Sequence, residues 1–168
     1  AAALQDRNRA VVIGTASFGK GSVQTVLRLP NDGEITLTWS RLVAPSGYMF
    51  HGLGIRPSIC TSGFQGSAQT VIDQAMNNRT KIEDVFIAWR KPGLPDKGKR
   101  TQLRNSCPAQ RRSNDLELKI AKRLILQPAL YARALDLTAA TMHAQAVMAQ
   151  ADLDGIVKLI DDFNALVD

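Results

Sequence analysis

A lysine between two glycines, Lys20, is the first residue of this sequence whose type and setting can support chemistry. It lies in residues 14–22 (GTASFGKGS), which nearly satisfy the phosphate-loop pattern GxxxxGK[ST]. Gly21 stands where that pattern needs the hydroxyl group that binds magnesium. The β-branched residues that follow also predict a strand, whereas a phosphate loop opens a helix whose amides bind the anion. The sequence therefore disfavours nucleotide binding.

A second hypothesis treats Lys20 as a catalytic amine. A lysine acts as a general base only where burial favours its neutral form, so its neighbours should be apolar. Phe18 and Val23 satisfy this requirement, and the two glycines let the backbone pass close to another strand. In an extended chain Gln24 lies on the same face as Lys20, because a separation of four is even. A neutral amide there would hold the amine without adding an opposing charge. A solvated turn lysine is the alternative.

The elements that must position Lys20 are short strands and a hairpin. Apolar or alternating runs predict strands at 10–13, 23–29 and 35–43, and a short extended piece at 58–61. Residues 30–33 (PNDG) join the middle two as a hairpin. Within its second strand, Ile35, Leu37 and Trp39 fall on one face. Helices are predicted at 1–6, from helix-forming residues, and from Ser67, as N-cap, through Asn77.

The next segment is basic. Residues 90–112 contain three prolines and two glycines, which predict a linker or a long surface loop. Between residues 90 and 123, eleven lysines and arginines face three acids, although the whole chain carries only +6. Such a segment either binds phosphates or is solvated, and we favour the solvated interpretation. Aromatic residues make up only 5% of the chain, so we expect no nucleic-acid partner.

The remainder of the chain is predicted to be helical. Asn114 and Glu117 resemble a capping box, and Pro128 suits the first turn of an alanine-rich helix that reaches about Gln150. A last helix is expected from Asp152. Three groups of apolar residues mark the buried faces of these helices: Leu116, Ile120 and Leu124; Leu130, Ala134, Leu137 and Met148; and Leu153, Ile156, Val157, Ile160, Phe163 and Val167. Burying the last stripe requires more apolar surface than the preceding helix offers, so we expect a homo-oligomer, with a dimer favoured.

The remaining candidate residues are few. Cys60 and Cys107 lack metal-site spacing, so we predict neither a metal nor a cofactor. From the residues alone, one disulfide and two buried thiols remain equally open. His51 and His143 have no partner at useful spacing, and we assign both to structural or surface roles. No run of 18 apolar residues occurs, so we predict no transmembrane segment.

Five short motifs in residues 1–60 resemble the carboxyl-terminal processing peptidases, also called tail-specific proteases. They are ALQD (3–6), RA (9–10), FGKGSVQ (18–24), the APSG turn (44–47) and GIRP (54–57), and their order and spacing match the family. FGKGSVQ is the specific signal among them. Beyond residue 64 the similarity is general, since the family often carries a helical C-terminal extension that helps assemble oligomers.

The resemblance implies a serine endopeptidase that cleaves exposed, apolar C-terminal tails of other proteins through a Ser–Lys dyad. It assigns the general base to Lys20 and a supporting role to Gln24. It also places the nucleophilic serine and a peptide-binding PDZ domain ahead of Ala1, so this chain alone is expected to be inactive. Ser17, Ser22, Ser40 and Ser46 are present but do not match the nucleophile position. A non-catalytic assembly or binding module is the alternative function.

The resemblance also implies a fold, a compartment and a covalent link. We expect an α+β fold: the strand-rich end of a crotonase/ClpP-like peptidase core over 1–63, a helix and basic linker over 64–112, and a helical module over 113–168. The family is usually exported, to the periplasm or beyond it, and exported chains with two cysteines commonly pair them. We therefore predict a disulfide between Cys60 and Cys107.

Overall fold

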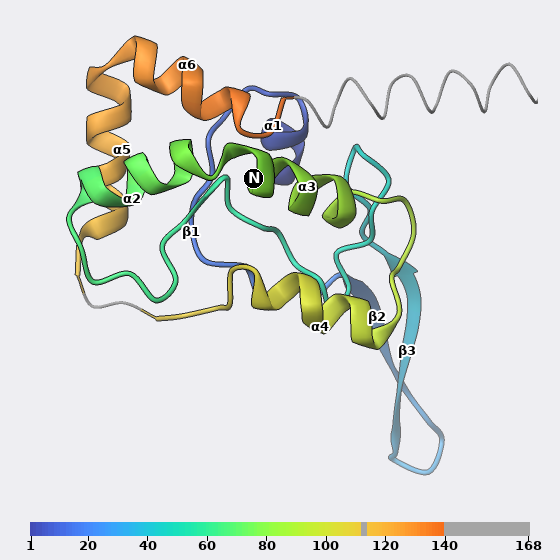
Figure 1. Cartoon of the computed structure of the whole chain (residues 1–168). Coiled ribbons are helices and arrows are strands. Elements are labelled where there is room, and N and C mark those ends of the chain that lie inside the picture. The colour runs from blue at the N-terminus through green and yellow to red at the C-terminus, as the bar shows by residue number, and fades with distance from the viewer. Residues whose placement is uncertain (112–113, 140–168) are drawn as a thin grey trace, which may run out of the picture.

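The structure is a computed structural model that describes residues 1–111 and 114–139, in which helices and two small sheets form an α+β fold (Figure 1). The elements in chain order are α1 (Ala2–Asp6), β1 (Ile13–Gly14), β2 (Ser22–Arg28), β3 (Glu34–Arg41), β4 (Ile59–Cys60), α2 (Ala68–Asn77), α3 (Arg79–Trp89), α4 (Lys97–Asn105), α5 (Leu116–Leu126) and α6 (Pro128–Asp136). No helix among these is long and apolar enough to cross a membrane.

β1 and β4 form a parallel pair in which Ile13 lies opposite Ile59 and Gly14 opposite Cys60. Both strands are shorter than the expected 10–13 and 58–61, although the backbone N–H of Ile59 also donates to the carbonyl of Val12. The pair packs against helices α2, α5 and α6 around one hydrophobic core. The fully buried members of that core include Ile59, Val71, Ile72, Ile120, Leu124, Ala134 and Leu137.

The hairpin that follows Lys20 has the predicted strands, β2 and β3, and extends away from the helices (Figure 1). Thr25 pairs with Leu37, and the indole Nε1 of Trp39 donates to the hydroxyl of Thr25 over 3.0 Å. Leu37 and Trp39 therefore share a face, as the alternation predicted. That face is open: Trp39 is 69% exposed.

A second hydrophobic core lies where α1, the chain around the hairpin's base, the end of α3 and helix α4 meet. It contains Tyr48, Leu53, Trp89 and Leu103. Neither α3 nor α4 was anticipated, and the linker expected over 90–112 is wrong at α4. The side chain of Asp96 accepts a hydrogen bond from the N–H of Lys99 and caps α4, while buried Leu103 anchors the helix.

Among the helices, two predictions hold. The side chain of Ser67 accepts from the N–H of Thr70 and caps α2 as expected, and Pro128 occupies the first turn of α6.

Two other predictions are wrong. The capping box expected from Asn114 and Glu117 is wrong, because the N-cap of α5 is Asp115, without a side-chain cap hydrogen bond. The Glu117 carboxylate accepts from the hydroxyl of Thr61 over 2.6 Å. Helix α6 ends at Asp136 rather than near Gln150. The helix expected from Asp152, its apolar stripe, Met148 and His143 all lie outside the described residues.

Candidate active site

Lys20 lies in a tight loop just before β2, and its side chain is exposed. The glycines on either side hold this loop against the chain that follows the hairpin. The N–H of Gly52 donates to the carbonyl of Gly19 over 2.8 Å, and the N–H of Leu42 donates to that of Gly21 over 2.8 Å. The backbone on both sides of Lys20 is therefore fixed by its partners.

This packing explains why the sequence needs glycine on both sides of the lysine. Gly19 has a φ of +85°, and a Cβ there would stand 2.7 Å from the nitrogen of Gly54. A Cβ on Gly21 would stand 2.5 Å from the nitrogen of His51. Real Cβ atoms essentially never approach so closely, so a larger residue would displace the loop that carries Lys20.

Gln24 lies in β2, on the exposed hairpin, where its Nε2 donates to the hydroxyl of Thr38 over 2.9 Å. Within the described residues no hydrogen bond joins Gln24 to Lys20. Just before this pair the register of the hairpin shifts: Val23 pairs with Ser40 and Gln24 with Thr38, so Trp39 is an extra residue in β3. Such a bulge re-aims the neighbouring side chains. The supporting role of Gln24 stays a prediction.

The serines are distributed over structural positions. Ser17 accepts a hydrogen bond at its hydroxyl from the N–H of Ile55, and the hydroxyl of Ser46 donates to Asp6 over 2.7 Å. Ser22 and Ser40 lie in the two strands of the hairpin. His51, assigned to a structural or surface role, lies beside Gly21, and its Nδ1 is buried without a hydrogen-bond partner among the described residues.

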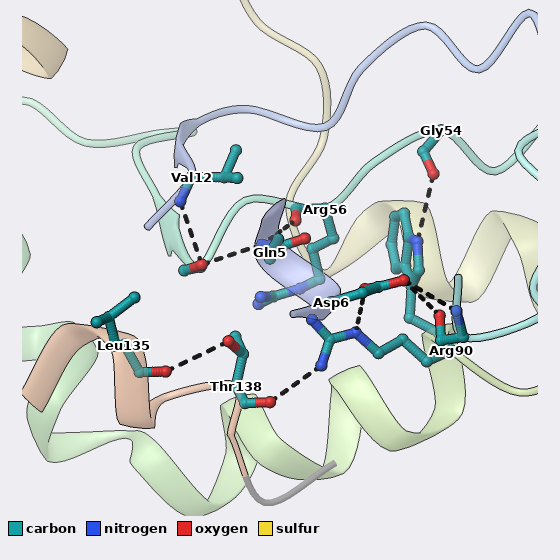
Figure 2. Close-up of polar contacts among 11 residues, drawn as sticks. Gln5, Asp6, Val12, Gly54, Arg56, Arg90, Leu135 and Thr138 are labelled. Carbon is teal, nitrogen blue, oxygen red and sulfur yellow. Dashed lines mark hydrogen bonds and ion pairs between the residues drawn. The ribbon is translucent and has the colours of Figure 1, made fainter. Parts of the chain in front are cut away.

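A largely buried polar network joins three of the motifs that carried the resemblance, ALQD, APSG and GIRP (Figure 2). Gln5 donates from Nε2 to the carbonyl of Arg56 and to the hydroxyl of Ser58, both over 3.0 Å. Asp6 Oδ1 lies 2.9 Å from Arg90 Nε, and Asp6 Oδ2 accepts from the N–H and the hydroxyl of Ser46. Hydrogen bonds thus join the ALQD, APSG and GIRP segments, and an ion pair joins ALQD to Arg90, which follows α3.

Two arginines of this network lie over an aromatic ring. The guanidinium groups of Arg56 and Arg90 each lie 4.9 Å from the ring centroid of Phe86, a distance that permits a cation–π interaction. Burial lowers the pKa of Arg56 to about 10. Burial also lowers the pKa of Arg90, and Asp6 opposes that shift. For Tyr48, burial and then the charge of Asp6 raise the pKa of the phenol above its ordinary value.

Sequence reasoning missed this network. Asp6 drew notice only as part of a motif, and Arg90 was counted as one cation in a basic run. No local pattern marks either of them as buried. The 1–111 and 114–139 ranges contain no group of three histidine, cysteine, aspartate or glutamate side chains arranged to hold a metal ion.

Cys60 and Cys107 form a disulfide with a Cα–Cα distance of 5.9 Å, which closes a sequence separation of 47 residues. It links β4 to the chain just after α4, and the N–H of Ala16 donates to the carbonyl of Cys107 over 3.3 Å. The segment after α4 therefore lies against the strand and loop that lead to Lys20.

Comparisons with known proteins agree with the motifs. The sequence profile of peptidase family S41 matches residues 1–61. The chain is 41% identical over 87 residues to the carboxy-terminal-processing protease of Bartonella bacilliformis, covering 52% of this chain and 18% of that protein. It is 33% identical over 83 residues to carboxyl-terminal-processing peptidase 3, chloroplastic, of Arabidopsis thaliana, covering 49% and 16%.

A third relative matches further along the chain. The probable CtpA-like serine protease of Staphylococcus aureus is 29% identical over 125 residues, covering 69% of this chain and 25% of that protein. The chain thus spans a quarter or less of the length of these relatives. With FGKGSVQ held in the glycine-flanked loop and three of the other motifs joined to one another, residues 1–61 match peptidase family S41, and the chain is similar to carboxyl-terminal processing peptidases.

Proposed function

We propose that this chain supplies the general base, Lys20, of a serine endopeptidase that acts through a Ser–Lys dyad. The observation that carries the proposal is the loop itself. Within the segment matched to the S41 family, Lys20 projects from a backbone held on both sides by hydrogen bonds at Gly19 and Gly21. A general base must be held at a fixed distance from its nucleophile. The hydrogen-bonded backbone of this loop can hold Lys20 in that way.

In the proposed reaction the neutral amine of Lys20 takes the proton of a serine hydroxyl as its oxygen attacks the scissile carbonyl carbon. The resulting ammonium then gives that proton to the leaving amine nitrogen, and an acyl-enzyme remains. Water hydrolyses the acyl-enzyme with Lys20 again acting as base. Lys20 and Phe18 are exposed in this chain. The proposal therefore requires that the surface carrying the serine cover them and exclude water.

We further propose that the nucleophile comes from residues that precede Ala1, and that these 168 residues alone are inactive. Of the four serines in residues 1–46, two have hydroxyls that are hydrogen-bonded to Ile55 or Asp6, and two lie in the hairpin strands. The substrates proposed are polypeptides with exposed, apolar C-terminal tails. In this scheme residues 1–63 are the end of a crotonase/ClpP-like core.

Gln24 is proposed to assist Lys20. Its amide nitrogen is occupied by Thr38, so its orientation is set across the hairpin. Its Oε1 accepts no hydrogen bond from the rest of the described chain. A neutral acceptor in this position would stabilise the amine of Lys20 by a hydrogen bond without adding a charge.

An exported location and self-association complete the proposal. The Cys60–Cys107 disulfide supports an oxidising compartment such as the periplasm, because cytosolic thiols are kept reduced. Self-association through residues 152–168 is proposed from their apolar stripe alone. Light scattering at tens of micromolar tests it: a dimer is expected, and a strictly monomeric mass would contradict it.

The test of the catalytic role uses this chain expressed together with whatever residues its gene encodes ahead of Ala1. A reporter with an apolar, labelled C-terminal tail is the substrate. Lys20→Ala should lower kcat/KM by at least about 1,000-fold, while Lys91→Ala, a change at another exposed lysine, should leave it unaltered. Gln24→Ala should lower kcat more than Thr38→Val does. Equal activity of the Lys20 and Lys91 variants would refute the proposal.

A non-catalytic binding module is the second candidate, and the exposed hairpin is the observation that favours it. Leu27, Ile35, Leu37 and Trp39 are all more than two-fifths exposed on a hairpin that packs against no third strand in the described chain. Exposed apolar patches often mark interaction sites. If hydrolysis is absent while Trp39→Ser abolishes binding to an unfolded polypeptide, the module is favoured over the enzyme.

A further inference from the structure

Arg104, on helix α4, donates hydrogen bonds to two backbone segments, residues 17–18 and Leu53, which meet at the loop that carries Lys20. One nitrogen of its guanidinium, Nη1, donates to the carbonyl of Leu53 over 2.8 Å, to that of Ser17 over 3.0 Å and to that of Phe18 over 3.4 Å. Residues 17–18 lead directly into the Gly19–Gly21 loop. Among the described residues no carboxylate pairs with Arg104. Its hydrogen bonds are thus directed to main-chain carbonyls.

Leu53, one of the carbonyl partners of Arg104, lies in the segment that packs against the Lys20 loop. Leu53 sits between Gly52, whose N–H donates to the carbonyl of Gly19, and Gly54, whose nitrogen packs against Gly19. Ser17 adds two further links, since its N–H donates to the carbonyl of Ile55 and its hydroxyl accepts from the N–H of Ile55. Arg104 therefore joins two segments that meet at the loop of Lys20.

Helix α4 is itself fixed, so Arg104 is a stationary donor. Leu103 is buried in the second hydrophobic core, and Cys107, three residues after Arg104, is held by the disulfide to Cys60. The carbonyl of Arg104 accepts from the N–H of Cys107 over 3.1 Å, and the carbonyl of Cys107 accepts from Ala16. The helix and the segment before Lys20 are thus joined at two places.

We propose that Arg104 is a positioning residue for Lys20. By holding residues 17–18 against Leu53, it fixes the backbone from which the amine projects. The residue lies outside the segment matched to the S41 profile. The inference rests on the proposed function, because the position of Lys20 matters for catalysis only if Lys20 is the base.

Loss of the Arg104 hydrogen bonds should affect the chemical step more than substrate binding. A displacement of about 1 Å in a reacting group can cost about 100-fold in rate. The hydrogen bonds of Arg104 to the segment before Lys20 go to the carbonyls of Ser17 and Phe18. Lysine at position 104 keeps the charge and can reach one carbonyl. It lacks the planar group whose donors are held in fixed directions. Partial rescue by lysine is therefore expected.

The first experiment uses hydrogen exchange on the 168-residue chain. In Arg104→Gln, the amides of Gly52 and Ile55, which donate to Gly19 and Ser17, should exchange about tenfold faster. Amides of α2 should not change. Lys99→Gln is the matched control: it removes one positive charge from an exposed position of the same helix. Equal exchange in both variants would overturn the proposal.

The second experiment measures peptide hydrolysis by the chain expressed with the residues encoded ahead of Ala1. Arg104→Gln should lower kcat about tenfold or more and leave KM within about twofold of the wild-type value. Arg104→Lys should recover part of kcat. Lys99→Gln should have the kcat and KM of the unaltered enzyme. If Arg104→Gln fails to fold, Arg104→Lys carries the comparison, and wild-type kcat in that variant together with unaltered exchange would overturn the proposal. A wild-type chain without any hydrolysis would refute the proposed function and with it the catalytic meaning of Arg104. The hydrogen-exchange result would still show whether Arg104 holds residues 17–18 against Leu53.

Discussion

Asp6 and Arg90 form a buried ion pair, with 2.9 Å between Asp6 Oδ1 and Arg90 Nε and only 1% of each side chain exposed. Asp6 ends α1, inside the segment matched to the S41 family, and Arg90 follows α3, outside it. Arg90 Nη1 also donates to the carbonyl of Thr138 over 3.0 Å (Figure 2). The pair thus connects three distant parts of the chain, across the boundary expected after residue 63.

Asp6→Ala should lower the free energy of unfolding by about 3–5 kcal/mol, because it removes the charge of Asp6 from beside the buried guanidinium of Arg90. Chemical denaturation measures the loss. Asp84→Ala, at an exposed position of α3, is the control and should change the stability by less than about 0.5 kcal/mol. The double variant Asp6→Ala/Arg90→Met should be more stable than the sum of its single losses predicts. Similar losses in the Asp6 and Asp84 variants would contradict this assignment.

The disulfide should make a large contribution to stability. Closing a loop of 47 residues restricts the unfolded chain and is worth about 4 kcal/mol in the chain-entropy model. Reductant should therefore lower the denaturation midpoint of the wild-type chain and leave that of Cys60→Ser/Cys107→Ser unmoved, since no other cysteine is present. If reductant left the wild-type midpoint unchanged, the cross-link would contribute nothing in solution.

The sequence predicted those elements whose signals are local. The hairpin follows from alternation and the PNDG turn, and α2 from its Ser67 cap and apolar face. Helix α4 was missed because lysines, arginines and a glycine fill it, and its one buried apolar residue, Leu103, forms no periodic face. What holds α4 is non-local: the disulfide after it and the carbonyls that Arg104 reaches.

In the candidate site, too, local patterns predicted some residues and missed those whose roles depend on non-local contacts. Lys20 was found from its motif, because the glycines on both sides report a close backbone approach. The partners of those glycines, His51 and Gly54, follow the whole hairpin in sequence, so no local pattern could identify them. Asp6 and Arg90 were likewise invisible as a pair, since a buried and an exposed charge look alike in a sequence.

Gly21→Ala should displace the loop that carries Lys20. The new methyl group would stand 2.5 Å from the nitrogen of His51 and 2.7 Å from Phe50 Cβ, and backbone there cannot yield cheaply. We expect a loss of about 1–3 kcal/mol in unfolding free energy, typical of overpacking. Gly66→Ala is the matched control, because its Cβ would meet Thr70 at an ordinary 3.5 Å. Equal stabilities of the two variants in thermal melts would show that the loop tolerates the methyl group.

Tyr48 should make the stability of the chain fall at alkaline pH. Burial, and after it the charge of Asp6, raise the pKa of this phenol above its ordinary value of 10.0. Below pH 10 the phenol is neutral in both states, and its contribution is fully present. Above pH 10 the unfolded chain loses the phenol proton and the folded chain keeps it, so unfolding becomes easier as the pH rises.

The difference in unfolding free energy between the wild-type chain and Tyr48→Phe should therefore fall by about 1 kcal/mol between pH 9 and pH 11. Arg56 acts in the opposite direction, because its pKa is lowered to about 10 by burial and the unfolded chain holds that proton longer. Since Arg56 is present in both proteins, its effect cancels in the difference. Urea denaturation at pH 9, 10 and 11 measures the trend. A difference that stays constant over these three values would mean that the phenol of Tyr48 ionises as readily in the folded chain as in the unfolded one.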